Sequence, residues 1–401
     1  MDMRRNIKLS HFQLRNVLAS TSRTRAFYPS DDETVHQFNP VSGKGQPIMQ
    51  LSGAPSSQVS TLAAGHGTLV AGCFNGEYII RHIDSGEPER TACHYGVITS
   101  DVSSGITNHA QIYTPRMSSS PVAAFASNDH SFRVLDIATE KWLSKEVYGF
   151  PLNCTAVSPD GRLRVMVGDH LNVFITTAES TRPGGKPEVL QSLSGHRDFG
   201  FACDWADDGW TVATGFQDKA IKIWDARRWT DSSGRALPVC TLRAEMAGVR
   251  NLRFSPIGSG KRVLVAAEEA DFINIIDAQS FRSKQTVDVF SEIGGVSFAN
   301  DGQDLMVLCC DRFRGGLMQL ERCGVEKDGG EMMWSSDEED SDSSMDEAYS
   351  SRWLRGKRAD RADRSETNDW PRSLFTEARR VKHANSERRR KGAVIGTLEP
   401  F

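Results

Sequence analysis

Short runs of apolar and β-branched residues recur along most of the chain, and a polar turn follows each run. One example is Thr211-Val-Ala-Thr-Gly-Phe-Gln-Asp218, which precedes a second run, Ile221-Lys-Ile-Trp-Asp225. Runs of this length, bounded by Gly, Asp, Asn and Ser, predict β-strands rather than helices. The pattern therefore predicts an all-β protein over residues 1–324.

A turn marker that ends in glycine repeats at a nearly constant interval. It occurs as Ser158-Pro-Asp-Gly161, Asp207-Asp-Gly209, Ser255-Pro-Ile-Gly258 and Asn300-Asp-Gly302, so that the final glycines are 48, 49 and 44 residues apart. Aspartates mark the ends of the apolar runs at Asp129, Asp136, Asp225, Asp271 and Asp277. A period in the forties, with several strands per unit, fits the four-stranded blade of a β-propeller.

The most complete copy begins with Gly195-His196 and ends with Trp224-Asp225. These two pairs, at this distance, resemble the signatures of the WD-repeat (WD40) family. The resemblance implies a seven-bladed WD40-type β-propeller, in which His196, Thr214, Asp218 and Trp224 form a hydrogen-bonded tetrad within one blade. A buried histidine needs partners at both ring nitrogens, which such a tetrad supplies. The alternative is that His196 and Asp218 are half of a catalytic charge relay, although no nucleophile motif accompanies them.

The other copies are less complete. We expect blades near residues 10–50, 56–92, 97–145, 150–187, 190–238, 242–284 and 288–323. The stretches 248–256 and 268–280 resemble a subgroup of uncharacterised fungal and plant WD-repeat proteins that carries a domain of unknown function. The resemblance covers residues 10–322 and implies a fold, but it implies no particular biochemistry.

Composition excludes several classes of protein. The 401 residues include 48 Lys plus Arg and 52 Asp plus Glu, a formal net charge of −4, which argues against a protein coated in basic charge. There is no apolar run of about 18 residues, and the start of the chain lacks the apolar centre of a secretory signal. We therefore expect a cytoplasmic and/or nuclear protein, not a secreted or membrane protein. The eight cysteines lack Cys-x-x-Cys spacing and are expected to be buried free thiols.

Residues 325–401 form a different kind of segment, which we expect to be a disordered tail. Residues 326–347 contain ten acidic residues and one lysine, too little apolar surface to offset the conformational entropy of the chain. Ser335 and Ser336 each have an acidic residue three positions later, the pattern that acidophilic kinases prefer. We take them as candidate phosphorylation sites.

The charge reverses in residues 352–391, where fourteen basic residues face six acidic ones. The cluster Arg388, Arg389, Arg390 and Lys391 is a candidate nuclear-import signal, and such a cluster can also neutralise phosphates. Leu374, Phe375, Ala378 and Val381 recur at helical spacing and predict a short helix over residues 373–385.

No catalytic pattern, cofactor motif or metal-ligand spacing occurs in the sequence. The segment Gly258-Ser-Gly-Lys261 lacks the first glycine and the final Ser or Thr of a phosphate-binding loop, and it predicts a turn. We therefore expect a non-enzymatic scaffold or adaptor that binds proteins or peptides through the propeller faces. Loop residues between blades, such as Arg197, Phe199 and Arg250, are candidate contacts. One alternative is a nuclear protein whose basic tail contacts nucleic acid while the propeller binds protein; another is a propeller hydrolase.

Overall fold

The computed structural model describes residues 2–3, 7, 9, 11, 13–53, 57–84, 92–99, 104–179, 187–311 and 315–322. The chain divides into two units, residues 1–327 and 328–401, and every described residue belongs to the first. The predicted tail 325–401 lies outside the described residues. The same is true of its acidic and basic runs, the helix 373–385, the phosphorylation sites Ser335 and Ser336, and the import cluster 388–391.

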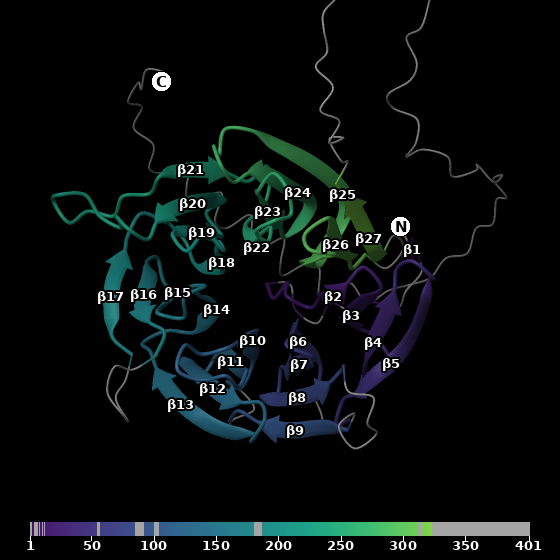
Figure 1. The fold of residues 1–401 in the computed structure, drawn as a ribbon. Helices are drawn as coiled ribbons and strands as arrows, with labels where there is room; N and C mark the ends of the chain where they lie inside the picture. The colour runs from purple at the N-terminus through teal and green to yellow at the C-terminus, as the bar shows by residue number, and fades with distance from the viewer. Residues whose placement is uncertain are drawn as a thin grey trace, which may run out of the picture. The chain divides into compact units, whose positions relative to one another are not determined.

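The described strands form antiparallel sheets arranged as the blades of a β-propeller around a central axis (Figure 1). This confirms the all-β propeller predicted from the sequence. Five of the sheets have four strands each. The first two contain β2 (Ala19–Ser22), β3 (Arg25–Pro29), β4 (Thr34–Asn39) and β5 (Lys44–Gln50), then β6 (Val59–Gly65), β7 (Thr68–Cys73), β8 (Glu77–His82) and β9 (Cys93–Val97).

The next three sheets follow in chain order. The third contains β10 (Thr107–Tyr113), β11 (Val122–Ser127), β12 (Ser131–Asp136) and β13 (Lys141–Val147). The fourth contains β14 (Leu152–Val157), β15 (Leu163–Gly168), β16 (Val173–Thr177) and β17 (Val189–Leu193). The fifth contains β18 (Gly200–Trp205), β19 (Thr211–Phe216), β20 (Ala220–Asp225) and β21 (Cys240–Arg243).

The sixth sheet has seven strands, because one long strand is shared between two groups. It contains β22 (Val249–Phe254), β23 (Val263–Glu268), β24 (Ala270–Asp277), β25 (Lys284–Ala299), β26 (Asp304–Cys309), β27 (Gly316–Glu321) and β1 (Asp2–Met3). β25 pairs with β24 up to Glu292 and with β26 from Ile293 onward. Six sheets are therefore present where seven separate blades were predicted, since β25 continues without a break from one group to the next.

Several of the predicted repeat units end before the fourth strand of their sheet, whereas the units at 10–50 and 97–145 largely coincide with the first and third sheets. The unit predicted at 190–238 begins inside β17, but β17 pairs with β16 in the preceding sheet. The outer strand of its own sheet is β21, which lies beyond the predicted end and pairs with β20. The offset arises because the aspartate marker ends the third strand of a sheet, and the more exposed fourth strand that follows carries no marker of its own.

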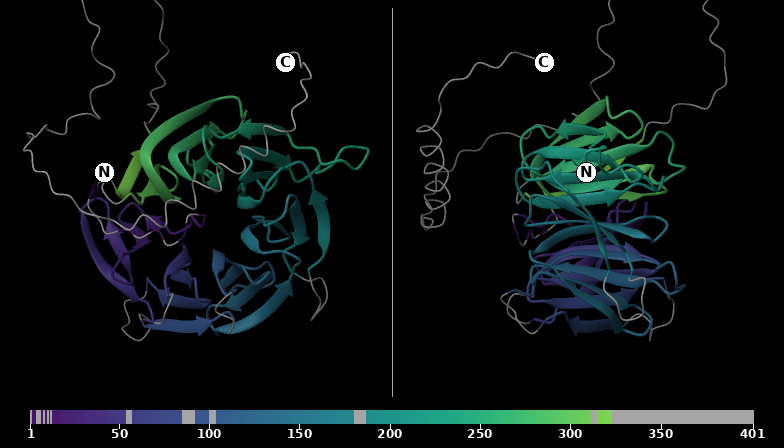
Figure 2. Two further views of the ribbon diagram at one scale, coloured as in Figure 1. Left: turned by 180° about the vertical axis from the view of Figure 1, so that it is seen from behind. Right: turned by 90° about the vertical axis from the view of Figure 1, so that its left-hand side faces the viewer.

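Alternation of strand direction gives the ring two different faces, which the side view shows edge-on (Figure 2). The joining face carries the segments between successive sheets, such as 148–151, 194–199 and 244–248, and the turns between second and third strands. The turn face carries the turns between first and second strands, such as 206–210 and 255–262, and those between third and fourth strands. Each inner strand from β6 to β22 therefore starts at the joining face.

Glycine allows the inner strand of one sheet to pack closely on the second strand of the sheet before it. A Cβ atom on Gly72 in β7 would lie 2.6 Å from the Thr107 side chain of the next sheet. A Cβ atom on Gly215 in β19 would lie 2.6 Å from Val249 of the next sheet. Both distances are far below van der Waals contact, so the spacing of these sheets requires residues without side chains at the two positions.

A buried ion pair links the third and fourth sheets. The Arg164 guanidinium on β15 is fully buried and donates to Glu146 on β13 at 2.9 Å and to the Ala178 carbonyl at 2.5 Å. Its guanidinium carbon also lies 3.8 Å from the centre of the Phe132 ring. The Tyr148 hydroxyl donates to the same carboxylate at 2.7 Å. Because both charges are buried, the packing of the third sheet on the fourth depends on Arg164 and Glu146 staying paired.

We expect the substitution Arg164→Met to lower the free energy of unfolding by about 3–5 kcal/mol, because it leaves the Glu146 carboxylate buried without its cation. Urea denaturation of the variant and the parent protein measures the change. The double variant Arg164→Met, Glu146→Gln is the control and should recover part of the loss. A single-variant loss under about 1 kcal/mol, the value of an exposed pair, would contradict this account.

Candidate functional site

The four side chains of the expected tetrad lie in one hydrogen-bonded chain on the fifth sheet. The His196 Nδ1 atom lies 3.2 Å from an Asp218 carboxylate oxygen, and His196 Nε2 lies 3.1 Å from Thr214 Oγ1. The Trp224 indole N–H donates to the same Thr214 oxygen at 2.9 Å. His196 also stacks on the Phe216 ring at a centroid distance of 3.6 Å. The chain of bonds connects the joining segment 194–199 to two strands and to a turn.

Burial decides what this network can do. Burial lowers the pKa of His196 although the Asp218 carboxylate raises it, so the ring is neutral near pH 7, donates from Nδ1 and accepts at Nε2. Thr214 is fully buried, and its hydroxyl already accepts the Trp224 N–H. The order Thr–His–Asp resembles a catalytic triad, but a substrate has no access to this hydroxyl. The geometry therefore favours a structural network over a charge relay.

Acidic residues at the turn between the second and third strands hold the joining segment in the fifth, sixth and second sheets. Asp218 also accepts the Arg197 backbone N–H at 2.8 Å. In the sixth sheet the fully buried Glu268 accepts the backbone N–H groups of Glu245, Met246 and Ala247 at 2.6–2.8 Å. In the second sheet Glu77 accepts the hydroxyls of Ser52 and Ser57 at 2.6 and 2.9 Å.

Two of the marker aspartates, Asp129 and Asp271, lie near this turn but differ from Asp218 in their contacts or their place in the sheet. Asp129 lies in the corresponding turn of the third sheet and forms a two-bonded ion pair with Arg133 at 2.5 and 3.0 Å. Asp271 lies within β24, and its backbone has a positive φ of 68°. The carboxylate that binds the joining segment there is Glu268, which the sequence reasoning missed. The sequence signal for it is the pair Glu268-Glu269, which stands just before the marker Asp271.

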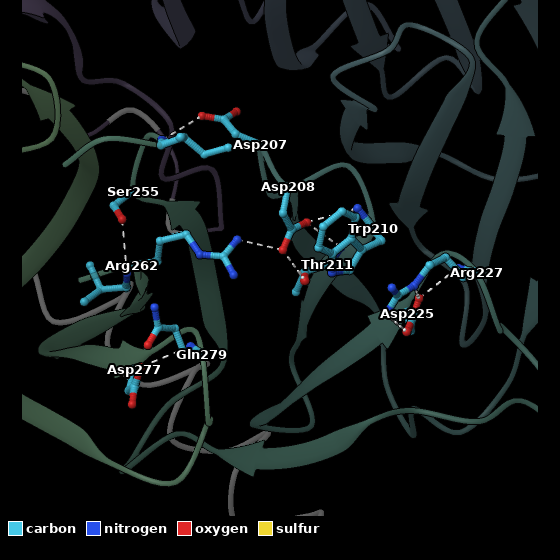
Figure 3. Close-up of polar contacts among 12 residues, drawn as sticks. Asp207, Asp208, Trp210, Thr211, Asp225, Arg227, Ser255, Arg262, Asp277 and Gln279 are labelled. Carbon is cyan, nitrogen blue, oxygen red and sulfur yellow. Dashed lines mark hydrogen bonds and ion pairs between the residues drawn. The ribbon is translucent and has the colours of Figure 1, made fainter. Parts of the chain in front are cut away.

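The remaining marker aspartates cap turns on the turn face, as Figure 3 shows for Asp225 and Asp277. Asp136, Asp225 and Asp277 each accept a backbone N–H two or three residues later, at 2.7–3.1 Å. Two turns of neighbouring sheets are joined there by an ion pair of 2.8 Å between Asp208 and Arg262. Burial raises the pKa of Asp208, but hydrogen bonds from Thr211, Trp210 and Arg262 outweigh burial and hold this pKa below its usual value. The turn face is thus cross-linked by groups that are already paired.

Three exposed apolar side chains occupy consecutive joining positions. Phe199 lies in segment 194–199, Met246 in segment 244–248, and Phe290 where β25 passes from one group of strands to the next. Their exposed fractions are 43%, 50% and 62%. Phe290 also has a positive φ of 49°, an uncommon backbone conformation for an aromatic residue. Arg197, the other predicted loop contact, is exposed beside Phe199.

Arg250, the third predicted contact, differs from the expectation. It lies on the inner strand β22 rather than in a loop, and only 4% of its surface is exposed. Its guanidinium carbon lies 4.0 Å from the centre of the Phe201 ring, and its Nη2 donates to Glu269 at 3.0 Å. Arg250 therefore faces the central channel rather than solvent.

A β-bulge recurs at the second residue of the inner strands. The register shifts at Ser60, Asn108, Asn153, Phe201, Arg250 and Gly294. A bulge re-aims its side chain, and three of these side chains bond the next inner strand. Ser60 donates to the Thr107 carbonyl at 2.5 Å, Asn108 to the Leu152 carbonyl at 2.9 Å, and Asn153 to the Gly200 carbonyl at 3.0 Å. At Phe201 and Arg250 this pattern stops.

Next to that interruption lies a cavity of about 20 Å³ in the central channel. Its walls come from the starts of four inner strands and from the segment before β2. The lining includes Gln13, Arg15, Asn16, His109, Asn153, Phe201, Arg250 and Arg253. Asn16 is held there by Arg253, which donates to its Oδ1 at 3.0 Å, and by its own donation to Thr61 at 3.0 Å. None of these channel residues other than Arg250 was expected from the sequence.

Cations gather around this cavity. Burial lowers the pKa of Arg250, the Glu269 carboxylate raises it, and the nearby Arg15 guanidinium lowers it further. Burial, Arg15 and Arg250 together lower the pKa of His11. Arg15 lies 3.6 Å from Glu292, whose side chain is more than half exposed. The cavity thus brings two buried guanidinium groups close to each other.

Neither a metal centre nor a membrane span emerges in the part of the chain that the structure describes. No group of three or more His, Cys, Asp or Glu side chains is arranged there to hold a metal ion. Within the same ranges, no helix has the length and apolar character to cross a bilayer.

We expect Thr214→Val to lower the free energy of unfolding by about 2 kcal/mol, because the buried His196 and Trp224 nitrogens lose the hydroxyl that joins them while the packed volume is kept. Chemical denaturation measures the loss. Thr241→Val on the exposed outer strand β21 is the matched control and should change stability by less than about 0.5 kcal/mol. Equal effects of the two substitutions would show that the tetrad contributes no stability.

Comparisons with known proteins give similarities of two kinds, one in sequence and one in structure. No family model matches the chain. A protein of Schizosaccharomyces pombe, described as "Uncharacterized protein C4G3.03", is 24% identical over 318 residues, which cover 74% of this chain and 85% of that protein. A chain in the crystal structure of the mitotic checkpoint complex superposes with a TM-score of 0.61 at 17% identity, and the match covers 80% of this chain and 91% of that one. This second similarity supports the propeller fold alone.

Proposed function

We propose that the chain is a non-enzymatic protein-interaction scaffold that binds its partner on the joining face. The observation that carries the proposal is the row of Phe199, Met246 and Phe290 on three consecutive joining positions. Large apolar side chains that stay exposed on a rigid frame are typical of protein interfaces. Propellers of this fold commonly present loops to proteins or peptides in this way.

Pre-organisation of the face supports the proposal. Segment 194–199 is held by His196 and Asp218, and segment 244–248 by three hydrogen bonds to Glu268. Segments held in this manner lose little conformational entropy when a partner binds. The corresponding carboxylates of the turn face are used for turn capping and for the Asp208–Arg262 pair.

We further propose that the ring is a seven-bladed propeller of the WD-repeat type and belongs to the uncharacterised subgroup that the sequence resembles. In the seven-stranded sheet, β22, β23, β24 and residues 284–292 match the four-stranded pattern of the other sheets. Residues 293–299 then pair with β26, which pairs with β27, and β1 completes the edge. This arrangement supports a sixth blade and a seventh blade joined by a continuous β25.

The proposal predicts that the triple variant Phe199→Ala, Met246→Ala, Phe290→Ala in the full-length protein lowers the recovery of its specific partners by at least about tenfold. Quantitative affinity purification followed by mass spectrometry measures the recovery. The reason is that the variant removes the apolar anchors while the backbone of the joining face is kept.

The matched control is the double variant Ile257→Ala, Trp210→Ala, which removes exposed apolar side chains from the turn face. It should retain the partners, and the melting temperatures of both variants should stay within a few degrees of the parent. Loss of the same partners in the control, or their retention in the triple variant, would place the interface elsewhere.

A further inference from the structure

Arg250 departs from the pattern that three of the other five bulge positions follow. Ser60, Asn108 and Asn153 each use a polar side chain to bond the next inner strand, whereas Arg250 makes no such bond and instead pairs with Glu269. Among the six bulge positions it is the charged residue. A buried charge at a position where a neutral amide or hydroxyl suffices costs stability. The position therefore calls for an explanation beyond the packing of the sheets.

The guanidinium of Arg250 has more donors than its surroundings use. Its Nη2 bonds Glu269, but its Nε and Nη1 atoms are buried without a hydrogen-bond partner among the described residues. Only 1% of the side chain is exposed. Both atoms belong to a side chain that lines the channel cavity, and Phe201 covers one face of the guanidinium. Unused donors of this kind bind carboxylate and phosphate oxygens well.

The size of the cavity limits what can enter. A volume of about 20 Å³ holds one group of the size of a water molecule. The ligand must therefore bring an oxygen atom on a thin extension, as the tip of an extended side chain does. A free nucleotide or a bulky metabolite does not fit this space.

We propose that the channel beside Arg250 is a binding site for an oxyanion carried on the side chain of a protein partner, either a carboxylate or a phosphate. This inference rests on the proposed interaction function and extends it, because the cavity opens among the same inner-strand ends from which the joining segments continue. The partner's apolar residues contact Phe199, Met246 and Phe290, and its acidic side chain reaches Arg250. Asp198 and Glu269 are the acidic groups that lie near the guanidinium among the described residues.

The experiment measures binding of short fluorescein-labelled peptides to the full-length protein by fluorescence polarisation. The probes are a poly-glutamate peptide, the same peptide with one central phosphoserine, and a poly-lysine peptide. The two acidic probes distinguish a carboxylate ligand from a phosphate ligand. We expect an acidic probe to bind and poly-lysine not to bind.

Arg250→Gln should weaken binding of the acidic probe by at least about tenfold, since it removes the charge and the fork of donors. Glu269→Gln should strengthen binding by about threefold, because it removes the carboxylate that competes for Arg250. A gain of this kind does not follow from a merely structural role of the pair. Arg282→Gln, an exposed arginine in the turn between β24 and β25 on the turn face, is the matched control and should change binding by less than about twofold.

Equal binding by the parent protein and Arg250→Gln, with melting temperatures that show both folded, would overturn the inference. So would the absence of binding by either acidic probe. Tighter binding of a single-stranded RNA, lost in Arg250→Gln, would show that the channel takes nucleic-acid phosphate and would also contradict it. If the anion site fails while the triple variant of the joining face still loses its partners, the scaffold function stands without this site.

Discussion

The need to satisfy backbone N–H groups where one sheet ends and the next begins determines much of this structure. These segments lie outside the ladders of paired strands, and an N–H left unpaired in a buried position costs about 1–3 kcal/mol. The protein meets the need with carboxylates placed at the turn between the second and third strands. Asp218 and Glu268 are the clearest cases: the first bonds the His196 ring and the Arg197 N–H, while the second bonds three backbone N–H groups. One constraint thus has two chemical solutions in neighbouring sheets.

This constraint links the stability of the fold to the proposed interaction surface. The carboxylates that hold the joining segments also fix where Phe199 and Met246 stand, since both residues lie in segments that these groups anchor. On the opposite face the aspartates cap turns and pair across sheets, which leaves that face consolidated (Figure 3). The central channel contains polar groups that are bonded to one another and polar groups that are not. Its inner-strand ends bond one another from Ser60 to Asn153, and beyond Phe201 the buried Arg250 keeps donors that its neighbours do not use.

The sequence predicted the propeller fold because glycine and aspartate markers recur at turns whatever the surrounding residues are. It also named the residues that form the His196 network, because Gly-His and Trp-Asp pairs stand at a recognisable distance. It did not predict the offset of the repeats, since the outer strands carry no marker and pair by backbone bonds alone. Nor did it reveal Glu268, a single acid that holds the joining segment of the sixth sheet as His196 and Asp218 together hold that of the fifth.

The channel could not be read from sequence for a different reason. Arg250, Asn108 and Asn153 come together only because each stands at a bulge in a different sheet, and the bulges depend on pairing between strands. Arg15 and Asn16 come from the N-terminal part of the chain, far from Arg250 in the sequence. Arg250 was expected in a loop between blades, where contact residues are commonly found. The structure instead places it where a short inner strand begins.

The most direct test of the central claim is amide hydrogen exchange at Glu245, Met246 and Ala247 in the parent protein and in Glu268→Gln. The account predicts slow exchange in the parent, because hydrogen bonds to the buried Glu268 carboxylate protect these groups, and exchange at least about tenfold faster in the variant. The amides of β18 to β20 should be unchanged. Exchange in the parent as fast as in an unprotected peptide would show that the carboxylate does not hold the joining segment.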